Sequence, residues 1–242
     1  MSKSQIKRRV ALFGIAANAI ALPIAINASN RNGDSSPVTK QDFVDFFEAK
    51  KRGDIDVMFI PRNSKSANVI VRNKTNKGMK VRMPEAFAGV PMLGQMGGMG
   101  GMGMGGGGMG GFQNIEPGKV RKFKVTTVCL EHGKKEPNPR VKYDIIPIES
   151  FTKKPEVIEL CRMLGSGQLN QSAAQAAAWH FTDDLTWIEL VNKIGARHLN
   201  GTVDRFFHPN TVRLGMRYAQ VAAQRAKLRP SQVDKIDSLS NQ

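Results

Sequence analysis

The hydrophobic pattern changes its period near residue 151, and this change constrains the fold of the 242-residue chain more than any other feature. Between residues 55 and 151, apolar side chains recur at every second position, as in 79–83 and 123–129. That is the period of a β-strand with one buried face. After residue 151 they recur three and four residues apart, as on a helix. The sequence therefore predicts an α+β fold, a small antiparallel β-sandwich (Ig-like or barrel-like) followed by an all-α helical domain.

Single elements follow from the same patterns. We expect at least five strands, over 55–60, 67–73, 79–83, 123–129 and 141–148, within a β domain at 55–151. The helical domain covers 152–229, and Pro155 suits the first turn of a helix. Its longest helix, 209–228, has a seam of mostly small residues that favours close helix packing: Val212, Met216, Ala219, Ala223 and Ala226. Residues 29–54 form a leader and a short helix that ends at Gly53, and 230–242 form a tail.

A low-complexity segment interrupts the β domain. Residues 94–111 contain only glycine, methionine and the single Gln95. Glycine loses much backbone entropy on folding and buries no side chain, so a disordered loop is expected. Thioethers at this spacing also suit Cu(I), which makes five methionines a candidate metal site: Met96, Met99, Met102, Met104 and Met109. The alternative is a generic flexible insert.

The first thirty residues have the pattern of a secretory signal peptide. Four positive charges, at Lys3, Lys7, Arg8 and Arg9, precede an apolar run over 10–26 and then small polar residues. Cleavage is expected after Ala28, and an uncleaved anchor is the alternative. We therefore expect an exported protein, periplasmic or extracellular, with no membrane span in the mature chain.

The mature chain remains strongly basic. Removing the four charges of the signal segment from the formal +16 leaves +12. Anionic envelope polymers, lipid head groups, nucleic acid or acidic proteins would be attracted to such a surface. The basic residues are scattered along the chain, which also fits an ordinary solvated surface.

The two cysteines allow several interpretations. Cys129 and Cys161 can form a disulfide in an oxidising compartment, or each can be a buried free thiol. Cys129 and His132 also form a Cys-x-x-His pair, half of a zinc-binding pattern, to which Cys161 and His180 could add ligands. The simplest interpretation of 132–133 is a turn at the end of a strand.

An alanine-rich helix is expected around 173–180. It contains Gln175 and Trp179, and the simplest interpretation is a core helix with Trp179 as its anchor. Val-Cys-Leu around Cys129, followed by Ala-Gln-Ala-Ala-Ala-Trp at 174–179, resembles the thioester domains of bacterial surface adhesins. That resemblance implies a covalent adhesion domain in which Cys129 is the acyl thiol and Gln175 lies in the helix that supports the bond.

Most of 40–195 resembles uncharacterised exported proteins of planctomycete-type bacteria. The shared motifs are Met-Pro-Glu-Ala-Phe-Ala (83–88), the glycine-rich insert, Val-Cys-Leu-Glu-His-Gly-Lys (128–134), Ala-Gln-Ala-Ala-Ala-Trp-His (174–180) and Leu-Thr-Trp-Ile-Glu-Leu (185–190). This resemblance implies a family with no assigned activity.

The sequence carries none of the common catalytic motifs. It has no Gly-x-Ser-x-Gly elbow, His-Glu-x-x-His helix, phosphate-binding loop or dinucleotide fingerprint. We therefore expect a non-enzymatic binding or structural module of the cell envelope that contacts an anionic polymer or protein. A thioester adhesion domain is the first alternative, and Cu(I) binding by the Met-rich segment is the second.

Overall fold

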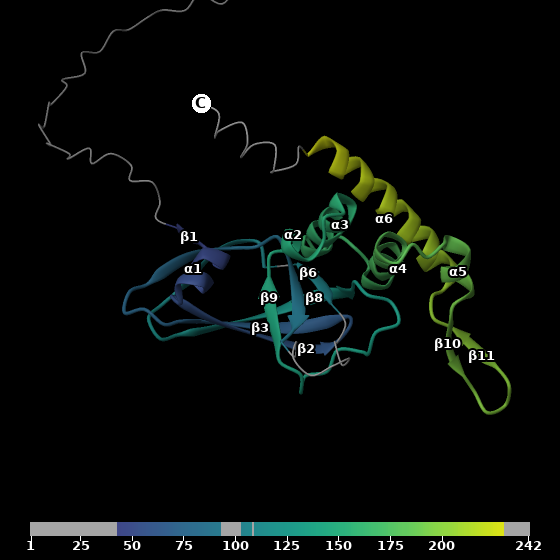
Figure 1. Ribbon diagram of the computed structural model, residues 1–242, viewed down its shortest axis with the longest axis horizontal. Helices are drawn as coiled ribbons and strands as arrows, with labels where there is room; N and C mark the ends of the chain where they lie inside the picture. Colours follow the sequence, from purple (N-terminus) through teal and green to yellow (C-terminus); the bar gives the residue numbers. More distant parts are fainter. Residues whose placement is uncertain (1–42, 93–102, 108, 230–242) are drawn as a thin grey trace, which may run out of the picture. The chain divides into compact units, whose positions relative to one another are not determined.

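The computed structural model describes residues 43–92, 103–107 and 109–229 (Figure 1). These residues belong to one compact unit, and its centre is a closed antiparallel barrel of six strands. Around the barrel the strands follow the order β2 (Ile55–Asn63), β3 (Ser66–Asn73), β8 (Val120–Cys129), β6 (Met104–Gly107), β5 (Ala86–Pro91) and β9 (Tyr143–Ile146). The pairing of Phe59 on β2 with Tyr143 on β9 closes the ring.

The period-two pattern fills the barrel as expected. Val69 and Val71 of β3 face the interior, and Val125 of β8 lies beside them in the same buried cluster. Phe59 contacts both Phe87 and Tyr143 with its ring, at centroid distances of 5.8 and 6.0 Å. A separate sheet joins β1 (Phe43–Asp45), β4 (Met79–Met83) and β7 (Gly111–Ile115), with β1 parallel to β4.

Strand β6 is made of Met104 and three glycines, so the prediction of a disordered loop over 94–111 is wrong for these residues. They are fully buried, and helix α3 (Pro155–Gly165) packs directly on them. A Cβ on Gly105 would lie 2.5 Å from Cys161 Sγ, and one on Gly107 would lie 2.8 Å from the Cys161 carbonyl oxygen. Glycine is needed here because the backbone of β6 and helix α3 approach too closely for a side chain.

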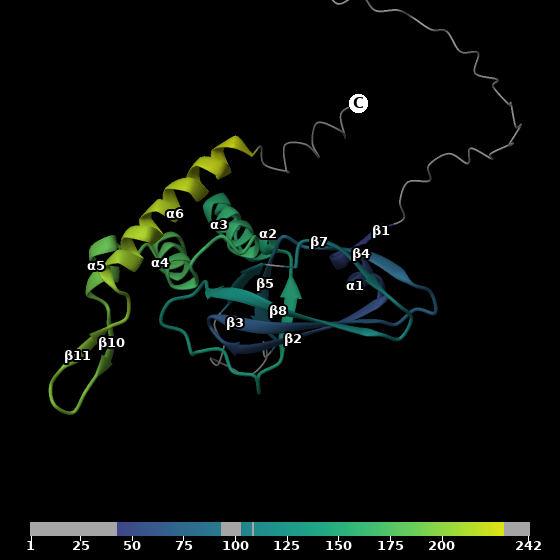
Figure 2. The ribbon, with the colours of Figure 1, turned by 180° about the vertical axis from the view of Figure 1, so that it is seen from behind.

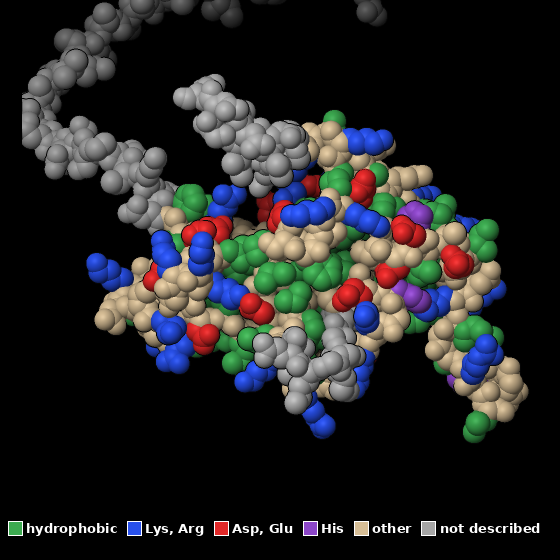
Figure 3. Space-filling view, viewed as in Figure 1, with side chains coloured by type: hydrophobic (Ala, Val, Ile, Leu, Met, Phe, Trp, Pro, Cys, Tyr) green, Lys and Arg blue, Asp and Glu red, His purple; other side chains and the backbone are tan. Residues whose placement is uncertain are grey.

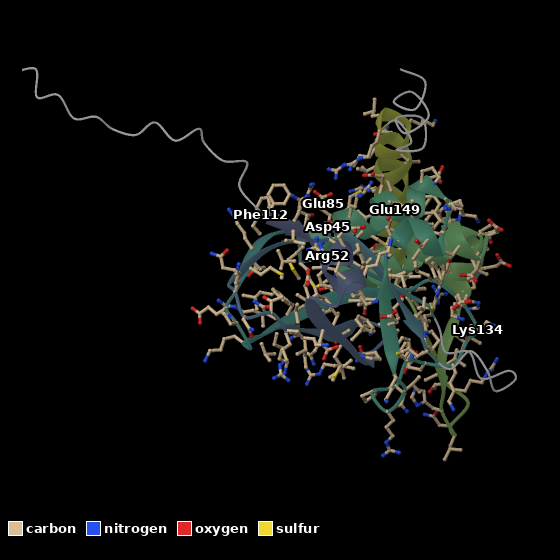
Figure 4. All side chains as sticks on the ribbon, turned by 60° about the vertical axis from the view of Figure 1, so that its left-hand side comes forward. Asp45, Arg52, Glu85, Phe112, Lys134 and Glu149 are labelled. Atoms are coloured by element: carbon tan, nitrogen blue, oxygen red, sulfur yellow. The ribbon has the colours of Figure 1, made fainter. Side chains whose placement is uncertain are left out.

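The remaining helices are α1 (Phe46–Arg52), α2 (Ile148–Phe151), α4 (Gln171–Thr182), α5 (Trp187–Asn192) and α6 (Pro209–Leu228). Helices α3, α4 and α6 pack on one another (Figure 2), and α3 and α4 also contact the barrel. Arg162 on α3 adds an ion-pair cluster with buried Glu159 and with Glu85 and Glu149, the last two labelled in Figure 4.

The predicted fold class, a β-sandwich followed by an all-α domain, is wrong. Six strands form a closed barrel beside the small sheet of β1, β4 and β7, and the helical segment contains a β-hairpin made of β10 (Ile194–Arg197) and β11 (Val203–Arg205). The helices also share a hydrophobic cluster with the barrel, in which Ala88 and Val128 pack with Leu160 and Ala177. The two parts therefore bury each other's apolar surface and share this part of the core.

The structure also defines the limits of α1 and the buried face of α6. The short helix α1 begins at Phe46, because the carboxylate of Asp45 accepts hydrogen bonds from the N–H groups of Phe47 and Glu48. Its predicted end at Gly53 is confirmed, with a left-handed φ of 80°. The buried seam of α6 consists of Val212, Gly215, Ala219 and Ala222. Of the other predicted seam residues, Met216 is exposed, and Ala223 and Ala226 are half-buried.

Several sequence predictions fall outside the described residues. These are the signal segment at 1–28, the leader up to residue 42 and the tail at 230–242. Within the described part of the chain, none of the helices combines the length and the apolar character needed to cross a membrane.

Candidate functional site

A cleft of about 500 Å³ lies where the barrel meets the helical segment. Its walls come from the β2–β3 turn, the end of β8 and the loop after it, helix α4, and the base of the β10–β11 hairpin. Clefts of this size accept small ligands or a few residues of a larger partner. It is therefore the candidate site.

Two glutamines of α4 hold the helix against the end of β8. Gln175 accepts a hydrogen bond from the Cys129 N–H (2.8 Å) and donates one to the Cys129 carbonyl (2.9 Å). Gln171, one helical turn earlier, donates to the carbonyl of Thr127 (3.0 Å). Strand β3 begins at Ser66, opposite Thr126, and the last bond from this side to β8 is donated by the Thr127 N–H to the Lys65 carbonyl (3.0 Å). The carboxamides thus satisfy main-chain groups that a longer β3 would otherwise pair.

The Cys129 thiol lies beneath this contact. Its sulfur accepts hydrogen bonds from Trp179 Nε1 (3.3 Å) and the Glu131 N–H (3.3 Å), and the thiol donates to the Glu131 carbonyl (3.0 Å). Burial raises the pKa of Cys129 to about 12, although the bonds from Trp179 and Glu131 act in the opposite direction. The group is therefore a neutral thiol at neutral pH.

Lys193 lies at the mouth of the cleft against aromatic rings. Its Nζ is 2.7 Å from His132 Nε2, 5.4 Å from the ring centroid of Trp179 and 5.6 Å from that of Phe206. Burial, and next the charge of Lys193, lower the pKa of His132, so its imidazole is neutral and accepts a hydrogen bond at Nε2. The main-chain N–H of His132 donates a hydrogen bond to Asp183 Oδ1 and so connects the loop after β8 to the end of α4.

The cleft has a cationic lining. Lys65, Lys134 and Lys193 line it, and Glu136 is the one acidic residue among the lining side chains. Glu136 Oε1 accepts hydrogen bonds from the N–H and the hydroxyl of Ser64. In the described part of the chain, none of the three lysines forms an ion pair with a carboxylate. Lys134 is labelled in Figure 4, and Figure 3 shows Lys and Arg side chains scattered over the face in view.

The predicted disulfide is absent, because Cys129 and Cys161 are both free and buried. Their side chains belong to different hydrophobic clusters. Cys129 packs with Trp179 and Leu190, whereas Cys161 lies over Gly105 in the cluster between α3 and the barrel. The alternative of two buried free thiols describes the structure.

The methionine series does not come together on one surface of the described chain. Met104 and Met109 are 0% and 2% exposed and belong to the barrel core, so their thioethers already serve packing. Met96, Met99 and Met102 lie outside the described residues. A five-methionine copper site would require the two core residues to leave the barrel.

The candidate zinc ligands also do not come together in the described part of the chain. Within 43–92, 103–107 and 109–229, no group of three or more His, Cys, Asp or Glu side chains could hold a metal ion. His180 points its Nδ1 to the Leu185 carbonyl (2.8 Å) and packs on Trp187. Cys161 lies in the other cluster.

Sequence reasoning found Cys129, His132, Gln175 and Trp179 but missed Lys193 and Phe206. Both missed residues flank the β10–β11 hairpin, which the helical period of this region hides. Asn200-Gly201 is a typical turn sequence of a β-hairpin, and apolar residues stand on both sides of it, at Ile194 and Val203. This pattern predicts a hairpin here.

Comparisons with known proteins assign this chain to no family. No family model matches this chain, and searches of curated proteins and of solved structures found no match. The two resemblances described from the sequence therefore stay predictions.

Proposed function

We propose that this protein is an exported, non-enzymatic binding module of the cell envelope, and that its cleft takes an anionic group of a polymer or protein partner. The basic and then apolar pattern of the first thirty residues supports export. The formal charge of +12 that remains without the four charges of the signal segment supports an anionic partner.

The observation that carries the proposal is the position of Lys193. Its ammonium rests on the rings of Trp179 and Phe206 and uses one donor on neutral His132. Buried or half-buried ammonium groups are usually paired with carboxylates, and this one has no such partner in the described chain. A carboxylate or phosphate of a ligand would complete the set of hydrogen bonds.

The cleft also selects for an apolar neighbour of that anion. Phe206 is 44% exposed, and buried Phe207 and Trp179 lie behind it. A ligand that carries an acidic group beside an apolar surface would bury part of Phe206 and satisfy Lys193 together. A bare inorganic anion would gain only the second contact.

The test is the binding of poly-L-glutamate by calorimetry at 50 and at 300 mM salt. We expect weaker binding at the higher salt, because screening reduces charge attraction. Lys193→Met should weaken binding about tenfold at low salt, in line with the loss of one charged hydrogen bond. Lys122→Met is the matched control, since it removes the same charge from an exposed position on β8 that does not line the cleft. Salt-independent binding, or equal effects of the two variants, would contradict the proposal.

A thioester adhesion domain is the second candidate, favoured by the contact of Gln175 and Trp179 with Cys129. In that reaction, the Cys129 sulfur bonds to a glutamine Cδ, the C–N bond breaks, and the thiol proton leaves with ammonia. Both carboxamide atoms of Gln175 hold the Cys129 main chain, so the acyl group would come from a different glutamine. The intact mass decides: a loss of about 17 Da supports a thioester, and an unchanged mass excludes it.

A further inference from the structure

The β10–β11 hairpin is the least covered element of the described chain. Its two strands pair only with each other, and all seven strand residues are exposed. Figure 1 and Figure 2 both show it extending away from α5. A lone two-stranded hairpin is marginally stable, and its open edges can pair with another chain.

We propose that an extended acidic peptide segment adds to the open edge of β10 and places a carboxylate in the cleft. This inference rests on the proposed function, because the cleft is the same, and it specifies the partner as a polypeptide in strand conformation. Strand addition of this kind derives its affinity from main-chain hydrogen bonds and its specificity from side chains.

The hairpin register identifies which main-chain groups are free. His198 donates its N–H to the Thr202 carbonyl (2.9 Å), and Phe206 donates its N–H to the Lys193 carbonyl (2.8 Å). Successive residues of an antiparallel strand direct these groups to opposite sides. Arg197, which precedes His198 and lies opposite Val203, therefore directs its N–H and carbonyl to the open edge of β10.

Strand β10 itself lines the cleft, whereas β11 ends just before the cleft residues Phe206 and Phe207. Ile194 and Gly195 of β10 line the cleft together with Lys193, whereas no residue of β11 does so. A strand added along β10 therefore ends at the cleft that Lys193 lines.

The charges of the hairpin favour an acidic segment. Arg197 and Arg205 form no ion pair within the described residues, and the one carboxylate of the hairpin, Asp204, is paired with His198. Ile194 and Val203 are 41% and 48% exposed, which offers apolar contacts between the charges. A segment that alternates acidic and β-branched residues matches both features.

The experiment uses the capped peptide (Glu-Val)₄ and compares it with polyacrylate, a carboxylate polymer with no main-chain amides. Two variants separate charge from main-chain pairing: Arg197→Ala removes the charge, and Arg197→Pro also removes the outward N–H. We expect Arg197→Pro to weaken peptide binding about tenfold more than Arg197→Ala does, since one main-chain hydrogen bond is lost. Polyacrylate should not distinguish these two variants.

Val203→Pro is the control for damage to the hairpin, because it removes an outward N–H on the β11 edge. It should leave peptide binding within about twofold of the wild type. Strand addition to β10 is overturned if both prolines weaken binding equally, or if Arg197→Pro and Arg197→Ala behave alike. In either case, the proposed function stands if polyacrylate binds and Lys193→Met weakens that binding. The proposed function is overturned as well if (Glu-Val)₄, polyacrylate and poly-L-glutamate all fail to bind.

Discussion

The close approach of β6 and α3 can be tested with a double-mutant cycle at Gly105 and Cys161. In Gly105→Ala, the new Cβ would lie 2.5 Å from Cys161 Sγ and 3.0 Å from Leu130 Cδ1. Ordinary contacts between such atoms are about 3.5–4.0 Å, so the thiol or the helix must move by about 1 Å. In Cys161→Ala, the obstructing sulfur is absent.

The expected energies follow from these distances. Overpacking of a well-filled core costs about 1–3 kcal/mol, and we expect about 2 kcal/mol for Gly105→Ala. Cys161→Ala leaves a small cavity at a fully buried position, at a cost of about 1 kcal/mol. In the double variant, the alanine Cβ takes the space that the sulfur has left, so its cost should be close to that of Cys161→Ala alone. The coupling energy is then about 1.5–2 kcal/mol, within the range of residues in contact.

Urea unfolding of the four proteins, followed by circular dichroism, measures the cycle. Gly110→Ala is the control within the same glycine-rich segment, because the nearest atom to its Cβ is 3.8 Å away. Its free energy of unfolding should change by less than about 0.5 kcal/mol. Additive effects of the two core substitutions, or equal effects of Gly105→Ala and Gly110→Ala, would refute the steric explanation of the glycine strand.

Two further predictions concern pH. The pKa of His132 is lowered in the folded protein, so the unfolded chain binds a proton more readily, and stability should decrease as pH falls below the ordinary value of 6.5. His132→Asn should reduce the change in urea midpoint between pH 7.5 and pH 5.5, and an unchanged slope would contradict this. Burial raises the pKa of Cys129 and Cys161 from 9.0 to about 12, so their contribution to stability is complete below pH 9 and is lost as pH rises toward 12. Cys161→Ala should flatten the decrease in unfolding free energy between pH 8 and pH 10, and equal decreases in the two proteins would argue against a neutral buried thiol.

The elements that the sequence predicted have strong side-chain periods. Strand β8 alternates, and Val125, Thr127 and Cys129 are buried as the alternation requires. Helix α3 begins at Pro155, and its apolar residues at three- and four-residue spacing are buried. Local patterns of this kind depend on residues that are close in the sequence, so one chain is enough to read them.

The parts that could not be predicted depend on contacts between distant residues. Barrel closure rests on one pair, Phe59 with Tyr143, and nothing in either segment specifies its partner. Strand β6 has three glycines, which give no hydrophobic period. Glycine is needed in this strand because Cys161, more than fifty residues later in the sequence, packs against its backbone. Within the site, the sequence motifs indicate Cys129 and Gln175, but the contact of Lys193 with Trp179 depends on where the β10–β11 hairpin lies.

The hydrogen bonds from Gln171 and Gln175 have a consequence for how this chain can vary. Both carboxamides contact main-chain atoms of Thr127 and Cys129, and every amino acid except proline presents those atoms alike. These hydrogen bonds do not depend on which side chain stands at position 129, whereas the bond from Trp179 Nε1 of α4 needs an acceptor in that side chain. Cys129→Ser should remove the thiol and keep both the carboxamide bonds and an acceptor for Trp179 Nε1, so the chemistry of the thiol can be studied separately from the fold.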